Sequence, residues 1–334
     1  MRSARRSLVA PPCWRRKFLA AVAASTLGCG NPAGRGVNAL DGGTWRQLAP
    51  LGLGARQETG VAALKGLIYV LGGFTDELAI VPRVEAYDPG KDEWTEVAPL
   101  PFPMHHVNTT VVDDRLYVLG ALMGGSFTAI GDAFTYDPAT GSWKSLTSMP
   151  LGTERGAGGT AAIGTKIYVA GGFRQNASVP DFSVYDTAND TWEVLPGLGE
   201  GRDHLIAAAA YEKLYVIGGR RDGVLRGDVH EFDPAAGKWA ARASMPTPRA
   251  GMAGALVVDR ILVSGGEGNP RDPSGVFPEN EAYDPKTDSW ERLEPMLTPR
   301  HGTGGAAVKD VFYVPGGAIQ QGFGAVATNE SFGS

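Results

Sequence analysis

Five arginines recur at one position of a repeating pattern, each sixteen residues before the first glycine of a pair. They are Arg56, Arg155, Arg202, Arg249 and Arg300, and Met104 takes this place in the second unit. Guanidinium groups bind carboxylates through two parallel hydrogen bonds, so a ring of these arginines would bind an anion. A side chain repeated in almost every unit could instead satisfy a backbone carbonyl that each unit contains. Both interpretations stay open, and we favour the structural one because a ligand lacks the symmetry of the repeat.

Four of the five histidines lie within two residues of this recurrent position, where imidazole groups could transfer protons or bind a metal. They are His105, His106, His204 and His301, and the acid Glu267 follows a glycine pair directly. The chain contains no H-E-x-x-H, G-x-S-x-G or G-x-x-x-x-G-K-[ST] motif, and no dinucleotide-binding fingerprint in a strand-to-helix context. Its two cysteines are Cys13 and Cys29, so no thiolate chemistry is available beyond residue 29. Sequence motifs therefore do not indicate an enzyme.

These residues belong to six repeated units of about 49 residues, a period that indicates a repeat architecture. Each unit contains a short β-branched or aromatic run that ends in glycine, which is typical of a strand followed by a tight turn. The six runs are LIYVLGG at 67–73, RLYVLGA at 115–121, KIYVAGG at 166–172, KLYVIGG at 213–219, RILVSGG at 260–266 and VFYVPGG at 311–317.

Two further landmarks flank each of these runs. Upstream lies a segment of small residues, namely GVAA, NTTV, GTAA, IAAA, AGAL and GGAA in chain order. Downstream of the first five runs come an aromatic residue with Asp, usually with Pro, and then a tryptophan; from Trp45 onward the tryptophans are 49, 49, 49, 47 and 51 residues apart. Small side chains are needed where several strands converge on one axis. Each unit is therefore predicted to hold four strands, with the small-residue strand innermost and the tryptophan strand outermost.

The glycine pair, the Tyr-Asp-Pro segment and the spaced tryptophan resemble kelch repeats over residues 45–332. The second unit departs from the pattern with Ala121 in place of the second glycine, and the fifth with Leu262 in place of tyrosine. The resemblance implies an all-β fold, a six-bladed kelch-type β-propeller over residues 44–334 with one four-stranded sheet per blade.

The ends of the chain are expected to complete one blade together. Six glycine-pair runs are followed by only five tryptophan strands, while the segment 45–48 stands alone before the first unit. We therefore predict that this N-terminal strand forms the outer strand of the last blade. Such pairing removes exposed sheet edges and closes the ring.

The first two strands of each unit form a hairpin, so the arginine position and the residues after the glycine pair should share one face. The candidate ligand-binding residues on this face are Arg56, His105, His106, Arg155, Arg202, His204, Arg249, Glu267, Arg300 and His301. The residues that select the ligand are expected where the six units differ from one another. These places are the histidines, Met104, Asp203 and the insertion 268–280.

We expect no metal ion and no cofactor. The histidines at 105 and 106 belong to the second unit, His204 to the fourth and His301 to the sixth, and none of these units are neighbours. Side chains that start on different sides of a ring should not converge on one ion at bond lengths of about 2.1 Å. The fifth histidine, His230, is interpreted as a surface or packing residue.

The first 29 residues are interpreted as an export signal. Six Lys or Arg and no acid occur in residues 1–17, and the uncharged stretch FLAAVAASTL follows at 18–27. The run RRKFL at 15–19 resembles a twin-arginine signal, and TLGC at 26–29 resembles a bacterial lipoprotein box. This implies cleavage before Cys29 and its lipidation, with simple cleavage and secretion as the alternative. Residues 30–43 would be a flexible linker, and the protein would lie in the periplasm, at the outer membrane or cell surface, or be secreted.

Charge and length restrict the partners. With 31 basic and 36 acidic residues the formal net charge is −5, which leaves no basic excess for binding nucleic acid. The ten-residue apolar stretch is too short to cross a bilayer core of about 30 Å, so we expect membrane contact only through a lipid anchor. We expect a monomer.

Together these features predict a non-catalytic binding module that binds a protein or a glycan at its loop face. The alternative is a carbohydrate-modifying enzyme. The resemblance extends to an exported six-bladed kelch family that isomerises sialic acids, which needs an acid/base group such as Glu267 and cations for the sugar carboxylate. Galactose-oxidase-like chemistry is excluded, because it needs a cysteine beside copper and the chain beyond residue 29 has none.

Overall fold

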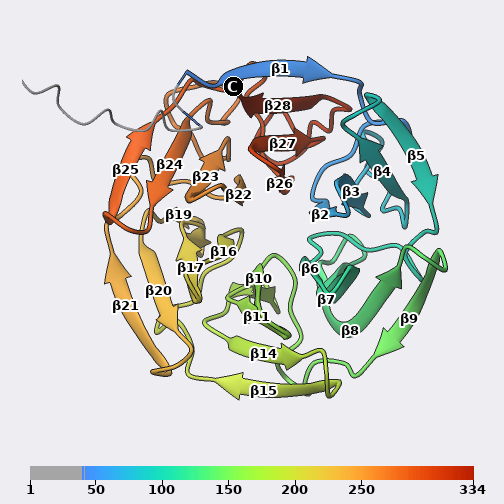
Figure 1. Cartoon of the computed structure of the whole chain (residues 1–334), viewed down its shortest axis with the longest axis vertical. Helices are drawn as coiled ribbons and strands as arrows, with labels where there is room; N and C mark the ends of the chain where they lie inside the picture. The colour runs from blue at the N-terminus through green and yellow to red at the C-terminus, as the bar shows by residue number, and fades with distance from the viewer. Residues whose placement is uncertain (1–39, 41) are drawn as a thin grey trace, which may run out of the picture. The chain divides into compact units, whose positions relative to one another are not determined.

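The computed structural model describes residues 40 and 42–334, so the export signal and most of the linker lie outside the described residues. Six four-stranded antiparallel sheets are arranged radially around a central axis (Figure 1). The predicted all-β, six-bladed propeller is confirmed. The described residues contain no helix, and accordingly none that could cross a membrane.

Each blade is built from strands in chain order, counted outward from the axis. Blade one holds β2 (Gly60–Leu64), β3 (Leu67–Leu71), β4 (Val84–Asp88) and β5 (Glu93–Val97), and blade two holds β6 (Thr109–Val112), β7 (Arg115–Met123), β8 (Thr128–Asp137) and β9 (Ser142–Leu146). Blade three holds β10 (Gly159–Ile163), β11 (Lys166–Ala170), β14 (Phe182–Asp186) and β15 (Thr191–Leu195), and blade four holds β16 (Ile206–Ala210), β17 (Lys213–Ile217), β20 (Val229–Asp233) and β21 (Lys238–Arg242). Blade five holds β22 (Ala253–Val257), β23 (Arg260–Ser264), β24 (Asn280–Asp284) and β25 (Ser289–Arg292). Blade six holds β26 (Ala306–Val308), β27 (Val311–Pro315), β28 (Asn329–Gly333) and β1 (Thr44–Leu48).

Side-chain size decides which strand faces the axis. The innermost strands carry mainly Ala, Gly and Thr, as in IAAAA of β16, and this lets six strands approach one another around the channel. The second strands carry larger aliphatic side chains that pack between neighbouring blades, and Val70, Val118, Val169 and Val216 are fully buried there. The hydrophobic core is therefore divided into layers between the blades.

A tryptophan on the outermost strand of each blade forms a hydrogen bond to the preceding blade. Every indole donates its Nε1–H to a backbone carbonyl of the preceding blade: Trp45 to Glu294, Trp94 to Ala49, Trp143 to Ala98, Trp192 to Thr147, Trp239 to Pro196 and Trp290 to Ala243, at 2.8–3.0 Å. The recurrent tryptophans are thus structural.

The predicted closure of the ring is confirmed. Strand β1 pairs antiparallel with β28, with Trp45 opposite Phe332, and the sheet order is β1-β28-β27-β26. Leu40, at the end of the segment interpreted as a linker, is buried in the same cluster as Trp45 and Phe332. The hydrophobic core of the propeller therefore includes a residue that precedes β1.

The connections between the second and third strands gather at one end of the propeller. They comprise residues 72–83, 124–127, 171–181, 218–228, 265–279 and 316–328, and we call this end the loop face. Two of them form small hairpins, β12 (Phe173–Arg174) with β13 (Ala177–Ser178) and β18 (Arg220–Arg221) with β19 (Val224–Leu225).

Candidate functional site

A belt of six residues surrounds the propeller axis just before the innermost strands. Each lies two positions after the recurrent arginine position: Glu58, His106, Ala157, His204, Gly251 and Gly302. Each donates its backbone N–H to the carbonyl of the belt residue in the preceding blade, and Glu58 closes the circle by donating to Gly302. The N···O distances of the other five bonds are 2.8–3.0 Å. One backbone hydrogen bond per blade therefore joins all six blades around the axis.

The belt requires a left-handed backbone. All six residues have φ between 50° and 66°, although only those of blades five and six are glycine. A non-glycine residue in this region costs about 1–2 kcal/mol. Glu58, His106 and His204 therefore occupy positions where glycine would serve the backbone better.

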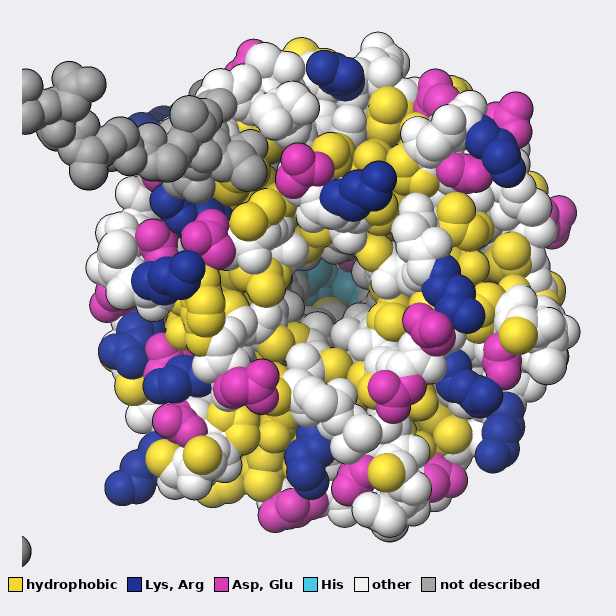
Figure 2. All heavy atoms as spheres, in the orientation of Figure 1, with side chains coloured by type: hydrophobic (Ala, Val, Ile, Leu, Met, Phe, Trp, Pro, Cys, Tyr) yellow, Lys and Arg dark blue, Asp and Glu magenta, His cyan; other side chains and the backbone are white. Residues whose placement is uncertain are grey.

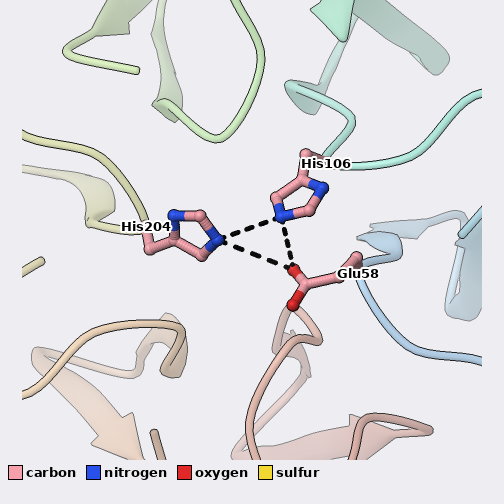
Figure 3. A group of neighbouring side chains, drawn as sticks. All are labelled: Glu58, His106 and His204. Carbon is pink, nitrogen blue, oxygen red and sulfur yellow. Dashed lines mark hydrogen bonds and ion pairs between the residues drawn. The ribbon is translucent and has the colours of Figure 1, made fainter. Parts of the chain in front are cut away.

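The side chains of these three belt residues meet at the axis (Figure 3). His106 Nε2 lies 3.0 Å from His204 Nε2 and 3.0 Å from Glu58 Oε2, and His204 Nε2 lies 4.0 Å from the same oxygen. The expectation that histidines from non-adjacent blades stay apart is wrong. The belt brings the chain so close to the axis that side chains from blades two and four, which are not neighbours, touch.

Both imidazoles have a second partner that fixes their orientation. His204 Nδ1 lies 2.5 Å from Asp203 Oδ1. His106 Nδ1 lies 2.5 Å from His105 Nδ1, and His105 Nε2 in turn lies 3.2 Å from the carbonyl of Gly124. Burial lowers the pKa of His105 to about 4 and holds the pKa of His106 well below its usual range.

Charged side chains surround this group. Arg220 bonds Asp203 at 3.0 Å, pairs with Glu267, and has a guanidinium nitrogen 3.2 Å from His204 Nε2. Burial alone would lower the pKa of Arg220, but Glu267 and Asp203 outweigh it and raise the pKa. Burial alone would raise the pKa of Glu267, but His301 and Arg220 outweigh it and lower the pKa. His301 Nδ1 lies 3.6 Å from Glu267 and 3.9 Å from Glu58.

The central channel ends at this group. A cavity of about 390 Å³ is lined by the small side chains of the innermost strands together with Glu58, His106 and His204. Figure 2 looks into the channel, and histidine side chains lie at its bottom. A molecule that entered the channel would therefore meet imidazole and carboxylate groups.

The five recurrent arginines lie elsewhere. Each is at most 2 % exposed, hydrogen-bonds the carbonyl of the first glycine of its own pair, and is absent from the channel lining. Arg249 also bonds the carbonyls of Thr247 and Val263 and the carboxylate of Glu281. Burial lowers the pKa of Arg155 to about 10. This geometry favours the structural role over an anion-binding ring.

The remaining predicted site residues are brought together, since His105, His106, His204, Glu267 and His301 all lie at or beside the belt. Sequence reasoning selected neither Glu58 nor Arg220 as a site residue, although Arg220 directly follows the glycine pair of the fourth unit. Aligning the six units would have shown Glu58 in the same column as two histidines.

An apolar strip crosses three neighbouring blades on the loop face. Phe74 of blade one lies 5.6 Å from Phe323 of blade six and 6.0 Å from Phe127 of blade two, between ring centroids. Among the described residues, ten large hydrophobic side chains are exposed, and five are on or beside these loops: Leu78, Met123, Val224, Ile319 and Phe323. Exposed apolar side chains gathered at one end of a molecule mark an interaction surface.

Comparison with known proteins gives consistent results. The profile described as "KLHDC2/KLHL20/DRC7 Kelch-repeats domain" matches residues 37–201 and 122–317. Kelch-like protein terF of Aspergillus terreus is 36 % identical over 301 residues, which cover 84 % of this chain and 66 % of terF. Kelch-like protein 35 of Mus musculus is 28 % identical over 46 % of this chain and 25 % of its own length. The chain thus spans about two thirds of the first relative and a quarter of the second.

A solved structure titled "Structure of YjhT" superposes with a TM-score of 0.68 at 18 % identity, covering 84 % of this chain and 95 % of that one. At this identity the similarity shows the fold alone. Propellers with this type of repeat are generally protein-interaction modules.

Proposed function

Since the chain belongs to the kelch-repeat propeller family, we propose that it is an exported, non-catalytic interaction module whose loop face binds a partner protein. The observation that carries this proposal is the apolar strip of Phe323, Phe74 and Phe127, together with the exposed side chains around it. Export is supported by the sequence of residues 1–29.

The chemistry of the strip suits a protein partner. Aromatic side chains dominate the centres of protein interfaces, where they supply a large contact area at a small cost in conformational entropy. Phe323 is 47 % exposed and Leu78 is 53 % exposed, so both are available for contact. Phe74 is buried beneath them and supports the ring of Phe323 edge-on.

The test compares the two ends of the propeller. Phe323→Asp changes the loop face, and Val258→Asp changes another exposed hydrophobic residue, in the hairpin between β22 and β23 at the other end. A protein captured from the cell envelope of the producing organism is purified, and its Kd is measured with each variant. We expect Phe323→Asp to weaken binding at least about tenfold and Val258→Asp to leave it unchanged. Equal effects, or a glycan bound in place of a protein, would refute the proposal.

A sugar-acid mutarotase is the second candidate. It is favoured by the pairing of Glu267 with Arg220 beside His204, because that reaction needs an acid/base group next to a cation. Exchange between the anomers of a sialic acid, followed by NMR, tests it directly. Acceleration by the wild-type protein that Glu267→Gln abolishes, with the melting temperature unchanged, would replace the binding proposal by this one.

A further inference from the structure

The belt side chains converge with the spacing of metal ligands. The three separations between Glu58 Oε2, His106 Nε2 and His204 Nε2 are 3.0, 3.0 and 4.0 Å. The point equidistant from these atoms lies about 2.0 Å from each, which is the length of a zinc bond to imidazole nitrogen or carboxylate oxygen. An ion at this point would lie within bonding distance of all three atoms. Because Glu58 Oε2 and His204 Nε2 are 4.0 Å apart, the bonds to these two atoms would be almost in line, so a tetrahedral zinc site with separations of about 3.3 Å needs shifts of a few tenths of an ångström in the three side chains.

The hydrogen bonds around His204 leave a lone pair on its inner nitrogen, Nε2. The guanidinium of Arg220 approaches this nitrogen at 3.2 Å, so an ion bound there would replace that contact. Asp203 is an acceptor, so the short contact at 2.5 Å requires the proton of His204 on Nδ1. In the neutral ring Nε2 then has a lone pair, which faces the axis. A carboxylate that accepts the outer proton of an imidazole is the usual support of a metal-bound histidine.

A longer chain of hydrogen bonds gives the same result for His106. The carbonyl of Gly124 accepts a proton from His105 Nε2, so His105 Nδ1 is an acceptor. His105 Nδ1 accepts from His106 Nδ1 at 2.5 Å, which leaves a lone pair on His106 Nε2. Two imidazole lone pairs and one carboxylate therefore face one another, an arrangement that a cation would stabilise.

The surrounding carboxylates also favour a cation. Glu58, Asp203 and Glu267 lie around a single guanidinium, that of Arg220. His301 is 1 % exposed, and its Nδ1 has no hydrogen-bond partner among the described residues. This nitrogen is directed at the carboxylates of Glu58 and Glu267.

The backbone conformation of the belt does not account for glutamate and histidine at these positions. Blades five and six meet the left-handed requirement of the belt with Gly251 and Gly302, and blade three meets it with the small Ala157. Glu58, His106 and His204 meet it with large polar side chains, against their conformational preference. We propose that these three side chains bind one divalent transition-metal ion of the Zn²⁺ type, with Asp203 and His105 as positioning residues. Two imidazoles and one carboxylate leave a further coordination position for water or an oxygen ligand in the channel.

The proposal is independent of partner docking and is tested on the full-length protein alone. After treatment with a chelator, the protein is titrated with Zn²⁺ by calorimetry and with Co²⁺ by visible absorption. We expect one ion per chain with a micromolar or lower Kd, and Co²⁺ absorption bands that show nitrogen and oxygen coordination. If the wild-type protein binds neither ion, the proposal is refuted. A proton shared between the facing side chains would then be the cation at this position.

Glycine variants separate metal binding from a structural role. We expect His106→Gly and His204→Gly to weaken Zn²⁺ binding at least about 100-fold, and Asp203→Asn to weaken it about 10–100-fold. Glycine suits the left-handed backbone, so the metal-free glycine variants should keep the propeller fold, which circular dichroism checks. His230→Asn removes a histidine outside the belt and should leave the affinity unchanged. Glycine variants that bind Zn²⁺ as tightly as the wild type would contradict the assignment, and Glu58→Gln, which keeps the side-chain size, provides a second check.

Discussion

The N-terminal strand β1 should contribute strongly to the stability of the whole ring, and Trp45→Ala tests this. The Trp45 ring is 6 % exposed, lies 5.4 Å from the Phe332 ring and 6.5 Å from the Phe312 ring, and donates a hydrogen bond to the Glu294 carbonyl. Replacing a buried tryptophan by alanine costs about 3–5 kcal/mol. At about 2 °C per kcal/mol for a protein of this size, the melting temperature should fall by about 6–10 °C.

The assay is thermal unfolding followed by circular dichroism or calorimetry. A chain that begins at Leu51 lacks β1, exposes the edge of β28, and should melt lower still than Trp45→Ala. The control is Arg46→Ala, because Arg46 lies on the same strand with its side chain exposed, and it should melt like the wild type. A truncated chain with the wild-type melting temperature would show that β1 does not close the ring.

Three further predictions concern buried charge, acid stability and processing. Arg249→Met strands the buried Glu281 carboxylate and should lower the free energy of unfolding by about 3–5 kcal/mol in urea denaturation; a loss under 1 kcal/mol would speak against the structural role of the arginines. Burial would raise the pKa of Glu231, but hydrogen bonds from Arg242, Lys213 and Tyr215 lower it to about 2, so its stabilisation is complete above the unfolded-state pKa and is lost as the pH falls from about 5 to 2. The stability difference between wild type and Glu231→Gln should therefore shrink over that range, and a constant difference would exclude this linkage. Mass spectrometry of the exported protein should find an N-terminal Cys29 carrying lipid, and Cys29→Ser should abolish the modification; an unmodified N-terminus elsewhere would favour simple secretion.

The fold could be predicted from the sequence because each repeated unit corresponds to one blade. Six glycine-pair runs with five following tryptophans determine both the number of sheets and the chain end that completes the last one. The position of Arg249 also followed from the repeat, since a side chain present in most blades bonds a carbonyl present in each, here that of Gly265. Such features depend on neighbours within one blade or in the next, which sequence spacing specifies.

The convergence of His106 with His204 could not be predicted in the same way. Sequence spacing gives the angle between two blades around the axis, but not how close to the axis each connection comes. That distance depends on the belt of backbone hydrogen bonds and on left-handed residues, which a glycine pattern does not reveal when the residues are Glu58 and His106. The interpretation that kept the histidines apart assumed a wider channel than the belt allows.

The protonation state of the histidine rings tests the central arrangement most directly. Nitrogen-15 NMR of the metal-free protein distinguishes the two tautomers of each neutral imidazole. The hydrogen bonds predict the proton on Nδ1 in His106 and His204, and on Nε2 in His105 and His301. Protonated Nε2 atoms in His106 and His204 would contradict this hydrogen-bond arrangement and, with it, the inward-facing lone pairs of the proposed metal site.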